Sequence, residues 1–272
     1  MTSVAKRFSR AAQTYERGAS LHRHVAACLM ETLPEPELVG VGRILEVGCG
    51  TGILTEPLRL RYPAASLCAL DAAEGMVAAV RERWGHDPRM EFVVADVREF
   101  SASQSFDLIV SSSALHWATP LEQTLSNLKR QLSVAGQCCA ALMIDGTLNE
   151  LHALRRRVAP GKIPEGRLPT GEEVLAAAGG AGFSVVASKE ECIQTRYHSA
   201  DDFLRTIHAQ GLTGGAVSRA SAALSRTELK RLRREYDVAF RARGDGVYAS
   251  FVVLYMQLAD DPQCCQKRDS NE

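Results

Sequence analysis

The sequence predicts an α/β fold in which helices cover both faces of a mostly parallel sheet. Short, almost continuous apolar runs alternate along the chain with segments that repeat apolar residues at helical spacing. Strands of a parallel sheet are buried on both faces, so they show such runs instead of a polar–apolar alternation. A glycine-rich turn, GCGTG (48–52), joins the first apolar run to a helical segment. Together these observations favour an open, layered sheet.

The predicted strands are apolar or β-branched runs, separated by turn residues such as those of PEPELVGVG (34–42). In order they are RILEVG (43–48), SLCALD (66–71), MEFVVAD (90–96), FDLIVSS (106–112), CCAALMI (138–144), FSVVASKEECIQTRYH (183–198) and VYASFVVLYMQLA (247–259).

Predicted helices lie between these strands. LHRHVAACLMETL (21–33), GMVAAVRERW (75–84) and LEQTLSNLKRQL (121–132) each repeat apolar residues at helical spacing. TGEE (170–173) and SRTE (225–228) are capping-box signatures, so a helix is expected to start at each. Because proline lacks an N–H, Pro57 predicts a late start or a kink in the helix after the glycine turn.

The pattern changes after Asp145, which suggests an insertion before the sheet is completed. Helical, Pro/Gly-rich and strand-like segments then mix until the final strand. The expected organisation is an N-terminal helical cap (1–36), a core with the glycine turn (37–146), a helical lid insertion carrying part of the sheet (147–245), the final strand (246–260) and a disordered tail (261–272).

Composition excludes several classes of protein. The formal net charge is zero, which argues against a nucleic-acid protein with a strongly basic field. No apolar run is long enough for a membrane span, and the N-terminus lacks a signal-peptide core. None of the eight cysteines has the spacing of a metal site, so we expect no metal and a reducing, cytoplasmic setting. The cysteines are Cys28, Cys49, Cys68, Cys138, Cys139, Cys192, Cys264 and Cys265.

The glycine turn predicts a nucleotide-like ligand at the carboxyl edge of the sheet. It does not match the dinucleotide fingerprint, because Ile53 stands where the third glycine would fall. The lysine and hydroxyl residue of a phosphate-binding loop are also absent. Glu46 lies two residues ahead of the first glycine, which suits a ligand with a cationic end instead of a pyrophosphate.

This arrangement resembles the class I S-adenosylmethionine-dependent methyltransferases, which have a Rossmann-like fold with an antiparallel last strand. The resemblance implies S-adenosylmethionine as cofactor. Asp71 matches the carboxylate for the ribose diol, Met76 the apolar residue against adenine, and Asp96-Val97 the pair that recognises the adenine edge. The full set of cofactor-binding residues implied is Glu46, Gly48, Cys49, Gly50, Gly52, Asp71, Ala72, Met76, Asp96, Val97, Ser111 and Arg23.

FDLIVSSSALHW matches the family's fourth strand and the loop that faces the transferred methyl group. Its polar candidates are the serines of that strand end, together with His116 and Trp117. His116 is the one candidate for a general base, but orienting an acceptor oxygen or packing is the favoured role. A carboxylate acceptor needs no base, because it is already ionised near pH 7.

A second resemblance covers the N-terminal segment and residues 200–260. VAKRFSRAAQTYERGASLHRHVA, SALHW and DDFLRTIHAQGLTG are similar to the malonyl-acyl-carrier-protein O-methyltransferases of biotin synthesis. The resemblance implies methylation of the free carboxylate of a malonyl thioester. It also implies substrate contacts by Tyr15, His116, Trp117 and Phe203, although Tyr15 and Phe203 could instead be core and Arg23 could lie in solvent.

An acidic carrier protein would be the partner of such an enzyme, and it calls for a local basic surface. Helical spacing groups the candidates, which could also be ordinary solvated helix faces: Arg155, Arg156, Lys230, Arg233 and Arg234. Two other functions stay open. The acceptor could be a small free carboxylic acid such as trans-aconitate or another small molecule, or the chain could be a non-catalytic cofactor-binding subunit.

Overall fold

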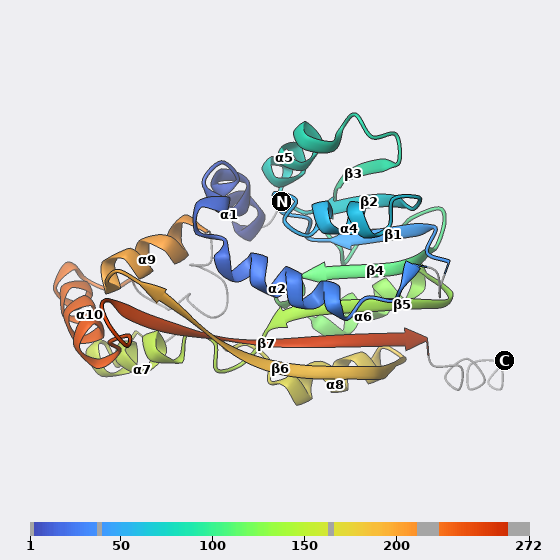
Figure 1. The fold of residues 1–272 in the computed structure, drawn as a ribbon. Coiled ribbons are helices and arrows are strands. Elements are labelled where there is room, and N and C mark those ends of the chain that lie inside the picture. Colours follow the sequence, from blue (N-terminus) through green and yellow to red (C-terminus); the bar gives the residue numbers. More distant parts are fainter. Residues whose placement is uncertain (1–2, 37–39, 163–165, 211–222, 261–272) are drawn as a thin grey trace.

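A seven-stranded sheet organises the chain, which is described here by a computed structural model covering residues 3–36, 40–162, 166–210 and 223–260 (Figure 1). The strand order is β3-β2-β1-β4-β5-β7-β6; the first five strands are parallel, and β7 runs antiparallel to β5 and β6. The strands are β1 (Arg43–Val47), β2 (Ser66–Asp71), β3 (Met90–Val94), β4 (Phe106–Ser112), β5 (Leu132–Met143), β6 (Phe183–Tyr197) and β7 (Val247–Asp260).

Helices cover both faces of this sheet, as the sequence predicts (Figure 1). Successive residues of β1 show why both faces are covered. Ile44 packs on one face of the sheet with α2 and α4, and Leu45 packs on the other face with α6 and α8. The helices are α1 (Ser3–Ala11), α2 (Ser20–Glu31), α4 (Thr55–Arg61), α5 (Glu74–Trp84), α6 (Leu121–Gln131), α7 (Asn149–Val158), α8 (Gly171–Gly180), α9 (Ala200–Ala209) and α10 (Arg226–Ala239), with 3-10 helices η1 (Tyr15–Gly18) and η2 (Leu115–Trp117).

The predicted boundaries differ from the structure mainly around β5. This strand begins at Leu132, directly after α6, instead of at 138. Both predicted capping boxes are present: Thr170 caps α8 and Ser225 caps α10, each with its glutamate partner. Pro57 lies in the first turn of α4, where the helix needs no N–H, so the helix starts at Thr55.

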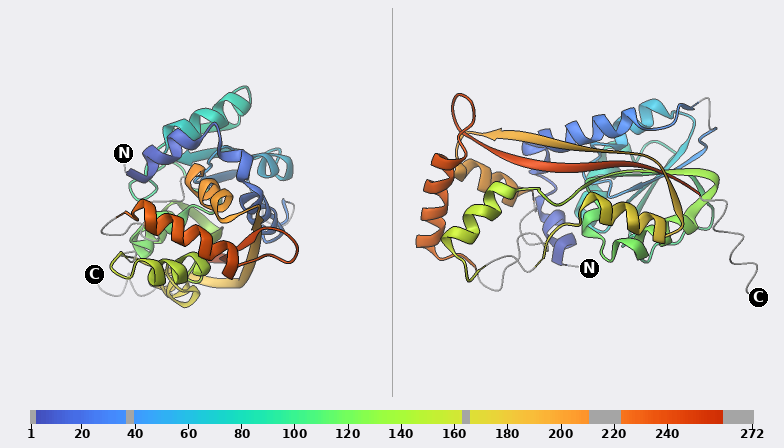
Figure 2. Two further views of the ribbon diagram at one scale, coloured as in Figure 1. Left: turned by 90° about the vertical axis from the view of Figure 1, so that its left-hand side faces the viewer. Right: turned by 90° about the horizontal axis from the view of Figure 1, so that it is seen from below.

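The antiparallel pair β6 and β7 extends past the rest of the sheet and carries the lid, whose helices α9 and α10 connect the two strands (Figure 2). Helices α7, α9 and α10 pack together at its far end, on the side of the sheet where the parallel strands finish. Aromatic rings fill the lid interior, with Phe203 5.1 Å from both Tyr197 and Tyr236 (ring centroids). The helix α8, although it belongs to the predicted insertion, covers the sheet instead. The predicted disordered tail, 261–272, lies outside the described residues.

Candidate active site

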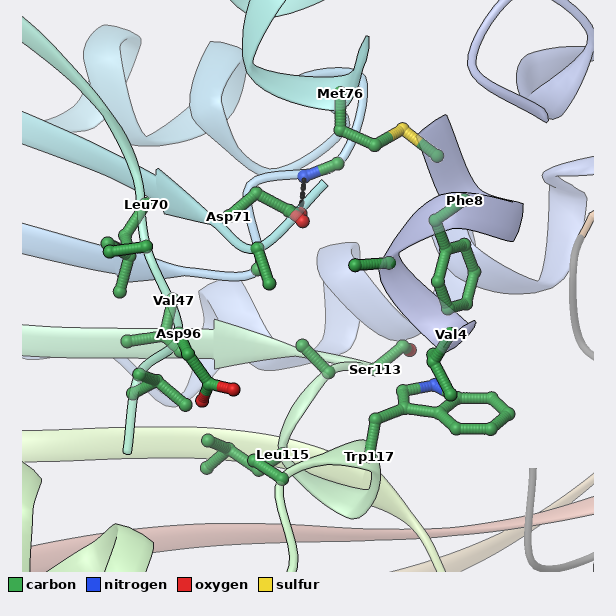
Figure 3. Close-up of a pocket in the computed structure, with 18 of the residues that line it drawn as sticks. Val4, Phe8, Val47, Leu70, Asp71, Met76, Asp96, Ser113, Leu115 and Trp117 are labelled. Atoms are coloured by element: carbon green, nitrogen blue, oxygen red, sulfur yellow. Dashed lines mark hydrogen bonds between the residues drawn. The ribbon is translucent and has the colours of Figure 1, made fainter. Parts of the chain in front are cut away.

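A pocket opens at the carboxyl ends of β1, β2, β3 and β4, beneath α1 (Figure 3). The carboxylates of Asp71 and Asp96 come from strand ends on one side, and Val4, Phe8 and Trp117 gather on the other. The lining consists of Val4, Ala5, Phe8, Tyr15, Val47, Gly48, Gly50, Leu70, Asp71, Ala72, Met76, Ala95, Asp96, Val97, Arg98, Ser112, Ser113, Ala114, Leu115, Trp117 and Ala118.

The glycine turn forms the floor of this pocket because its backbone takes conformations that side chains would block. Gly48 has a φ of +74°, and a Cβ added there would lie 2.2 Å from the Cβ of Ala114. Gly50 has a φ of +55°, and no atom lies within 4 Å of the position of an added Cβ. Position 48 therefore requires glycine because of both close packing and backbone conformation. Position 50 favours glycine because of its backbone conformation alone.

Asp71 is fixed by the backbone around it. Its Oδ2 accepts a hydrogen bond from the N–H of Gly50 (3.0 Å), and its Oδ1 accepts one from the N–H of Ala73 (2.8 Å). Burial raises the pKa of the carboxyl group, and these N–H groups oppose the shift by stabilising the ionised form. Each oxygen keeps a free lone pair, so Asp71 can accept hydrogen bonds from two neighbouring hydroxyls.

Asp96 has a partner that the sequence analysis missed. Arg98 donates from Nε to Asp96 Oδ1 (2.9 Å) and from Nη2 to Oδ2 (2.5 Å), so the pKa of Asp96 is lowered. The pair offers an acceptor next to Val97, whose side chain is buried. Met76 is also buried and supplies an apolar surface across the pocket. A flat ring system with an amino edge fits between these groups.

A smaller hollow adjoins the pocket on the far side of the glycine turn and shares Tyr15, Gly48, Gly50, Ser112 and Ser113 with it. Several buried polar atoms around it have no hydrogen-bond partner within the described residues. They are His22 Nδ1, Thr51 Oγ1, Ser113 Oγ and, behind the turn, Glu46 Oε1. Buried polar groups are normally satisfied, so these atoms fit a ligand that carries both donors and acceptors.

Burial favours the neutral forms of four side chains near the pocket: His116, His22, Glu46 and Tyr15. It lowers the pKa of His116 to about 3 and that of His22 to about 4, and raises that of Glu46 to about 8. The pKa of Tyr15 is raised, first by burial and then by Asp71. His116 Nδ1 accepts a hydrogen bond from the N–H of Met143 (3.4 Å), so its ring faces the sheet.

Six predicted site residues are absent from the lining of both the pocket and the smaller hollow: Arg23, Ser111, Phe203, Glu46, Gly52 and His116. Arg23 is exposed and donates to the backbone oxygen of Glu16 (3.1 Å). Ser111 is buried and donates to the backbone oxygen of Val47, because it points to the opposite face of β4 from its neighbour Ser112. Phe203 lies in the aromatic interior of the lid.

Other residues of the pocket were missed by the sequence analysis. Val4 and Phe8 reach it from α1. Ser113, which was one of the candidate serines, reaches it from the loop after β4. Phe8 contacts Trp117 edge-to-face at 5.6 Å between ring centroids. The N-terminal resemblance, which includes Phe8, was the available signal for this contact. The remaining predicted residues are brought together: Tyr15, Trp117, the glycine turn and the two strand-end aspartates.

The predicted basic residues occupy the lid, where α7 packs against α10. Arg156, Lys230 and Arg234 are exposed. Arg233 is held by Asp201 (Nη2 to Oδ1, 3.1 Å). Arg155 is partly buried and donates from Nε to the backbone oxygen of Lys162 (3.1 Å).

Known proteins match this chain over the core and beyond. The family described as "Methyltransferase domain" matches residues 44–136. A malonyl-[acyl-carrier protein] O-methyltransferase of Geobacter sulfurreducens is 34% identical over 261 residues, covering 93% of this chain and 96% of that protein. The enzyme of the same name from Anoxybacillus flavithermus is 32% identical, covering 89% and 91%.

A solved structure, the YcgJ protein of Bacillus subtilis, has the same fold with a TM-score of 0.61 at 15% identity, covering 87% of this chain and 98% of that one. Among the described residues, no helix combines the length and apolar character needed to cross a bilayer. Both of these O-methyltransferases match the chain across the lid as well as the core. The chain therefore belongs to the malonyl-[acyl-carrier protein] O-methyltransferase family, and it is an O-methyltransferase with the class I methyltransferase fold.

Proposed function

We propose that the chain transfers a methyl group from S-adenosylmethionine to the free carboxylate of a malonyl thioester carried by an acyl-carrier protein. The product is the methyl ester. The observation that carries the proposal is the likeness to proteins named for this reaction along both the core and the lid, because the lid is where methyltransferases of this fold differ in acceptor.

The pocket fits the proposed cofactor. Asp71 would accept both ribose hydroxyls, and Asp96 with Val97 would meet the adenine edge while Met76 lies against the ring. The unpartnered atoms of His22 and Thr51 would meet the amino-acid end of the cofactor. When bound, S-adenosylmethionine supplies an electrophilic methyl group on a sulfonium.

The chemistry proposed needs alignment and exclusion of water instead of a base. A malonyl carboxylate is ionised at pH 7, so one of its oxygens forms the new O–CH₃ bond as the S–CH₃ bond breaks and sulfur leaves as a neutral thioether. Tyr15 in its neutral form, Phe8 and Trp117 line the pocket and make a low-polarity wall for this step. Less water around the carboxylate strengthens it as a nucleophile.

The carrier protein is proposed to dock on the outer face of α7 and α10, where Arg156, Lys230 and Arg234 are exposed. The proposed partner is an acidic carrier protein, and charge complementary to these basic side chains would raise the rate at which the two proteins meet. The six cysteines of the described residues are free thiols, which agrees with a reducing, cytoplasmic setting for this reaction.

The test is a transfer assay with methyl-labelled S-adenosylmethionine and three acceptors: malonyl-carrier protein, malonyl-CoA and trans-aconitate. We expect a base-labile labelled ester on the malonyl thioesters, with the carrier protein turned over at the lowest concentration. Labelling of trans-aconitate alone would contradict the proposed acceptor. Labelling of none, with cofactor binding intact, would contradict the proposed activity.

A further inference from the structure

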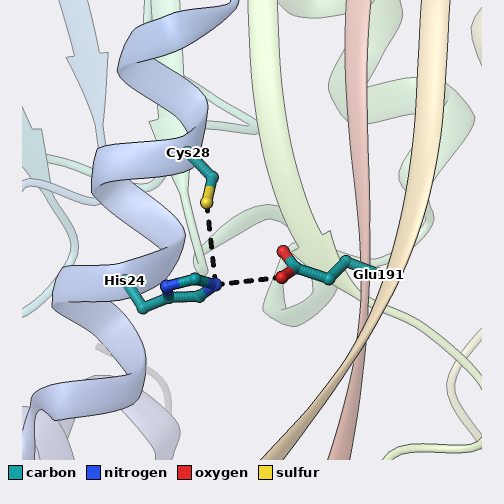
Figure 4. Close-up of side chains that lie close together, drawn as sticks. All are labelled: His24, Cys28 and Glu191. Atoms are coloured by element: carbon teal, nitrogen blue, oxygen red, sulfur yellow. Dashed lines mark hydrogen bonds and ion pairs between the residues drawn. The ribbon is translucent and has the colours of Figure 1, made fainter.

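A cluster of three potential metal ligands lies between α2 and the edge strand β6, and none of the three lines the pocket or the smaller hollow (Figure 4). His24 and Cys28 are four residues apart on α2, so they share one face of the helix. Glu191 comes from β6, and its side chain points toward them. His24 Nε2 lies 3.0 Å from Glu191 Oε1 and 3.6 Å from Cys28 Sγ.

Both contacts fall on the same ring nitrogen, and this excludes a proton relay of the Cys–His–carboxylate kind. A relay uses the two ring nitrogens separately, one for the thiol and one for the carboxylate. A single nitrogen carries either one proton or one lone pair, so it cannot serve both partners of His24 well. One cation placed between the three atoms would satisfy all of them at once.

We propose that His24, Cys28 and Glu191 bind a divalent zinc-like ion. Imidazole, thiolate and carboxylate are the ligands that Zn²⁺ takes, and three protein ligands plus water complete a tetrahedron. With bonds of about 2.0–2.3 Å, tetrahedral nitrogen and sulfur ligands lie about 3.5 Å apart. The distance between His24 Nε2 and Cys28 Sγ is 3.6 Å. The thiolate and carboxylate charges together balance the ion.

The surroundings support the site. Tyr255 on β7 donates its hydroxyl to Glu191 Oε2 (3.0 Å), which orients the carboxylate and leaves Oε1 facing His24. The side chains of His24 and Glu191 are 47% and 28% exposed, so an ion can enter from solvent. The ion would fasten α2, whose His22 borders the smaller hollow, to the sheet edge at β6. It would stabilise the N-terminal cap and take no part in the chemistry.

The test uses full-length protein freed of metal by a chelator and titrated with Zn²⁺ or Co²⁺ alone. We expect one ion per chain, a thiolate-to-cobalt absorption band, and protection of Cys28 from alkylation by at least tenfold, located by peptide mass spectrometry. Cys28→Ala should lose the band. Glu191→Gln should weaken Zn²⁺ binding at least tenfold, although glutamine keeps a hydrogen-bonding side chain. Tyr255→Phe should weaken Zn²⁺ binding about tenfold.

Cys192 provides the matched control. It is exposed on β6 beside Glu191, but successive residues of a strand point to opposite faces. Cys192→Ser should therefore keep both the cobalt band and the Zn²⁺ affinity of the parent. The proposal is overturned if Cys28→Ala retains the band, if Zn²⁺ protects Cys192 equally well, or if the parent binds no stoichiometric ion.

Discussion

In the core, Asp71 receives two backbone N–H groups and is held by the same turn that shapes the pocket. In the lid, Lys230 and Arg234 project from α10 into solvent, with no ion pair to the described residues. The first arrangement is rigid and specific for one ligand geometry. The second leaves long side chains free to meet a partner. A substitution in the core site should therefore strongly weaken cofactor binding, whereas one on the lid should only slow the encounter with the partner protein.

The largest effect should come from Asp71→Ala. Removing two charge-assisted hydrogen bonds to a ribose diol should cost about 3 kcal/mol, or roughly a hundredfold in affinity for S-adenosylmethionine. Calorimetric titration measures this loss, and the thermal unfolding curve checks that the turn survives without its carboxylate. Asp71→Asn, which keeps an acceptor in place, should lose less. Equal affinity of parent and Asp71→Ala would refute the proposed cofactor site.

The sequence predicted which strand-end side chains gather at one pocket, because each of them follows a strand of the sheet. Asp71 and Asp96 stand at or just after the ends of parallel strands, and the sheet brings those ends to one edge. The prediction lost accuracy at single-residue level. Ser111 was chosen as the cofactor-binding serine, but the pleat turns it toward Val47, and the other two candidate serines, Ser112 and Ser113, line the pocket.

Contacts made by tertiary packing could not be derived from spacing. Val4 reaches the pocket only because α1 docks beside α5, where Ser9 Oγ accepts the N–H of Gly75 (2.7 Å). Phe203, expected at the acyl site, is buried in the lid because neighbouring rings surround it. Arg98 pairs with Asp96 through local geometry, which the sequence shows only as two charges two residues apart.

Alanine substitutions at two glycines of the same turn separate the effect of close packing from that of backbone conformation. Gly48→Ala adds a Cβ against the rigid Ala114 in a left-handed conformation, and should cost about 2–5 kcal/mol of folding free energy. Gly50→Ala meets open space and should cost only about 1–2 kcal/mol from its backbone conformation. Urea unfolding of both variants gives these values. A Gly50 variant as unstable as the Gly48 variant would contradict the packing explanation.

Charge reversal on the lid should have a smaller and more selective effect. The double variant Lys230→Glu/Arg234→Glu should raise the KM for malonyl-carrier protein roughly tenfold and leave that for malonyl-CoA unchanged. The effect should shrink as salt is added, because exposed charges are screened. Arg89→Glu, at an exposed site before β3, is the matched control and should behave as the parent does. An equal rise of KM for both acceptors would argue against docking here.

The smallest effect on turnover should come from His116→Asn, because the proposed acceptor needs no base. We expect kcat within about threefold of the parent and an unchanged pH profile near neutrality.

In His116→Asn, the pH dependence of the folding free energy should change more than kcat does. The pKa of His116 is about 3 in the folded chain against an ordinary value of 6.5, so unfolding takes up a proton between these pH values. Folding stability is therefore lost as pH falls below 6.5, and removing the imidazole should reduce that slope by about 1.4 kcal/mol per pH unit. Urea unfolding at several pH values between 4 and 6.5 measures the slope. A large fall in kcat would instead identify His116 as a catalytic group, and an unchanged slope would contradict its lowered pKa.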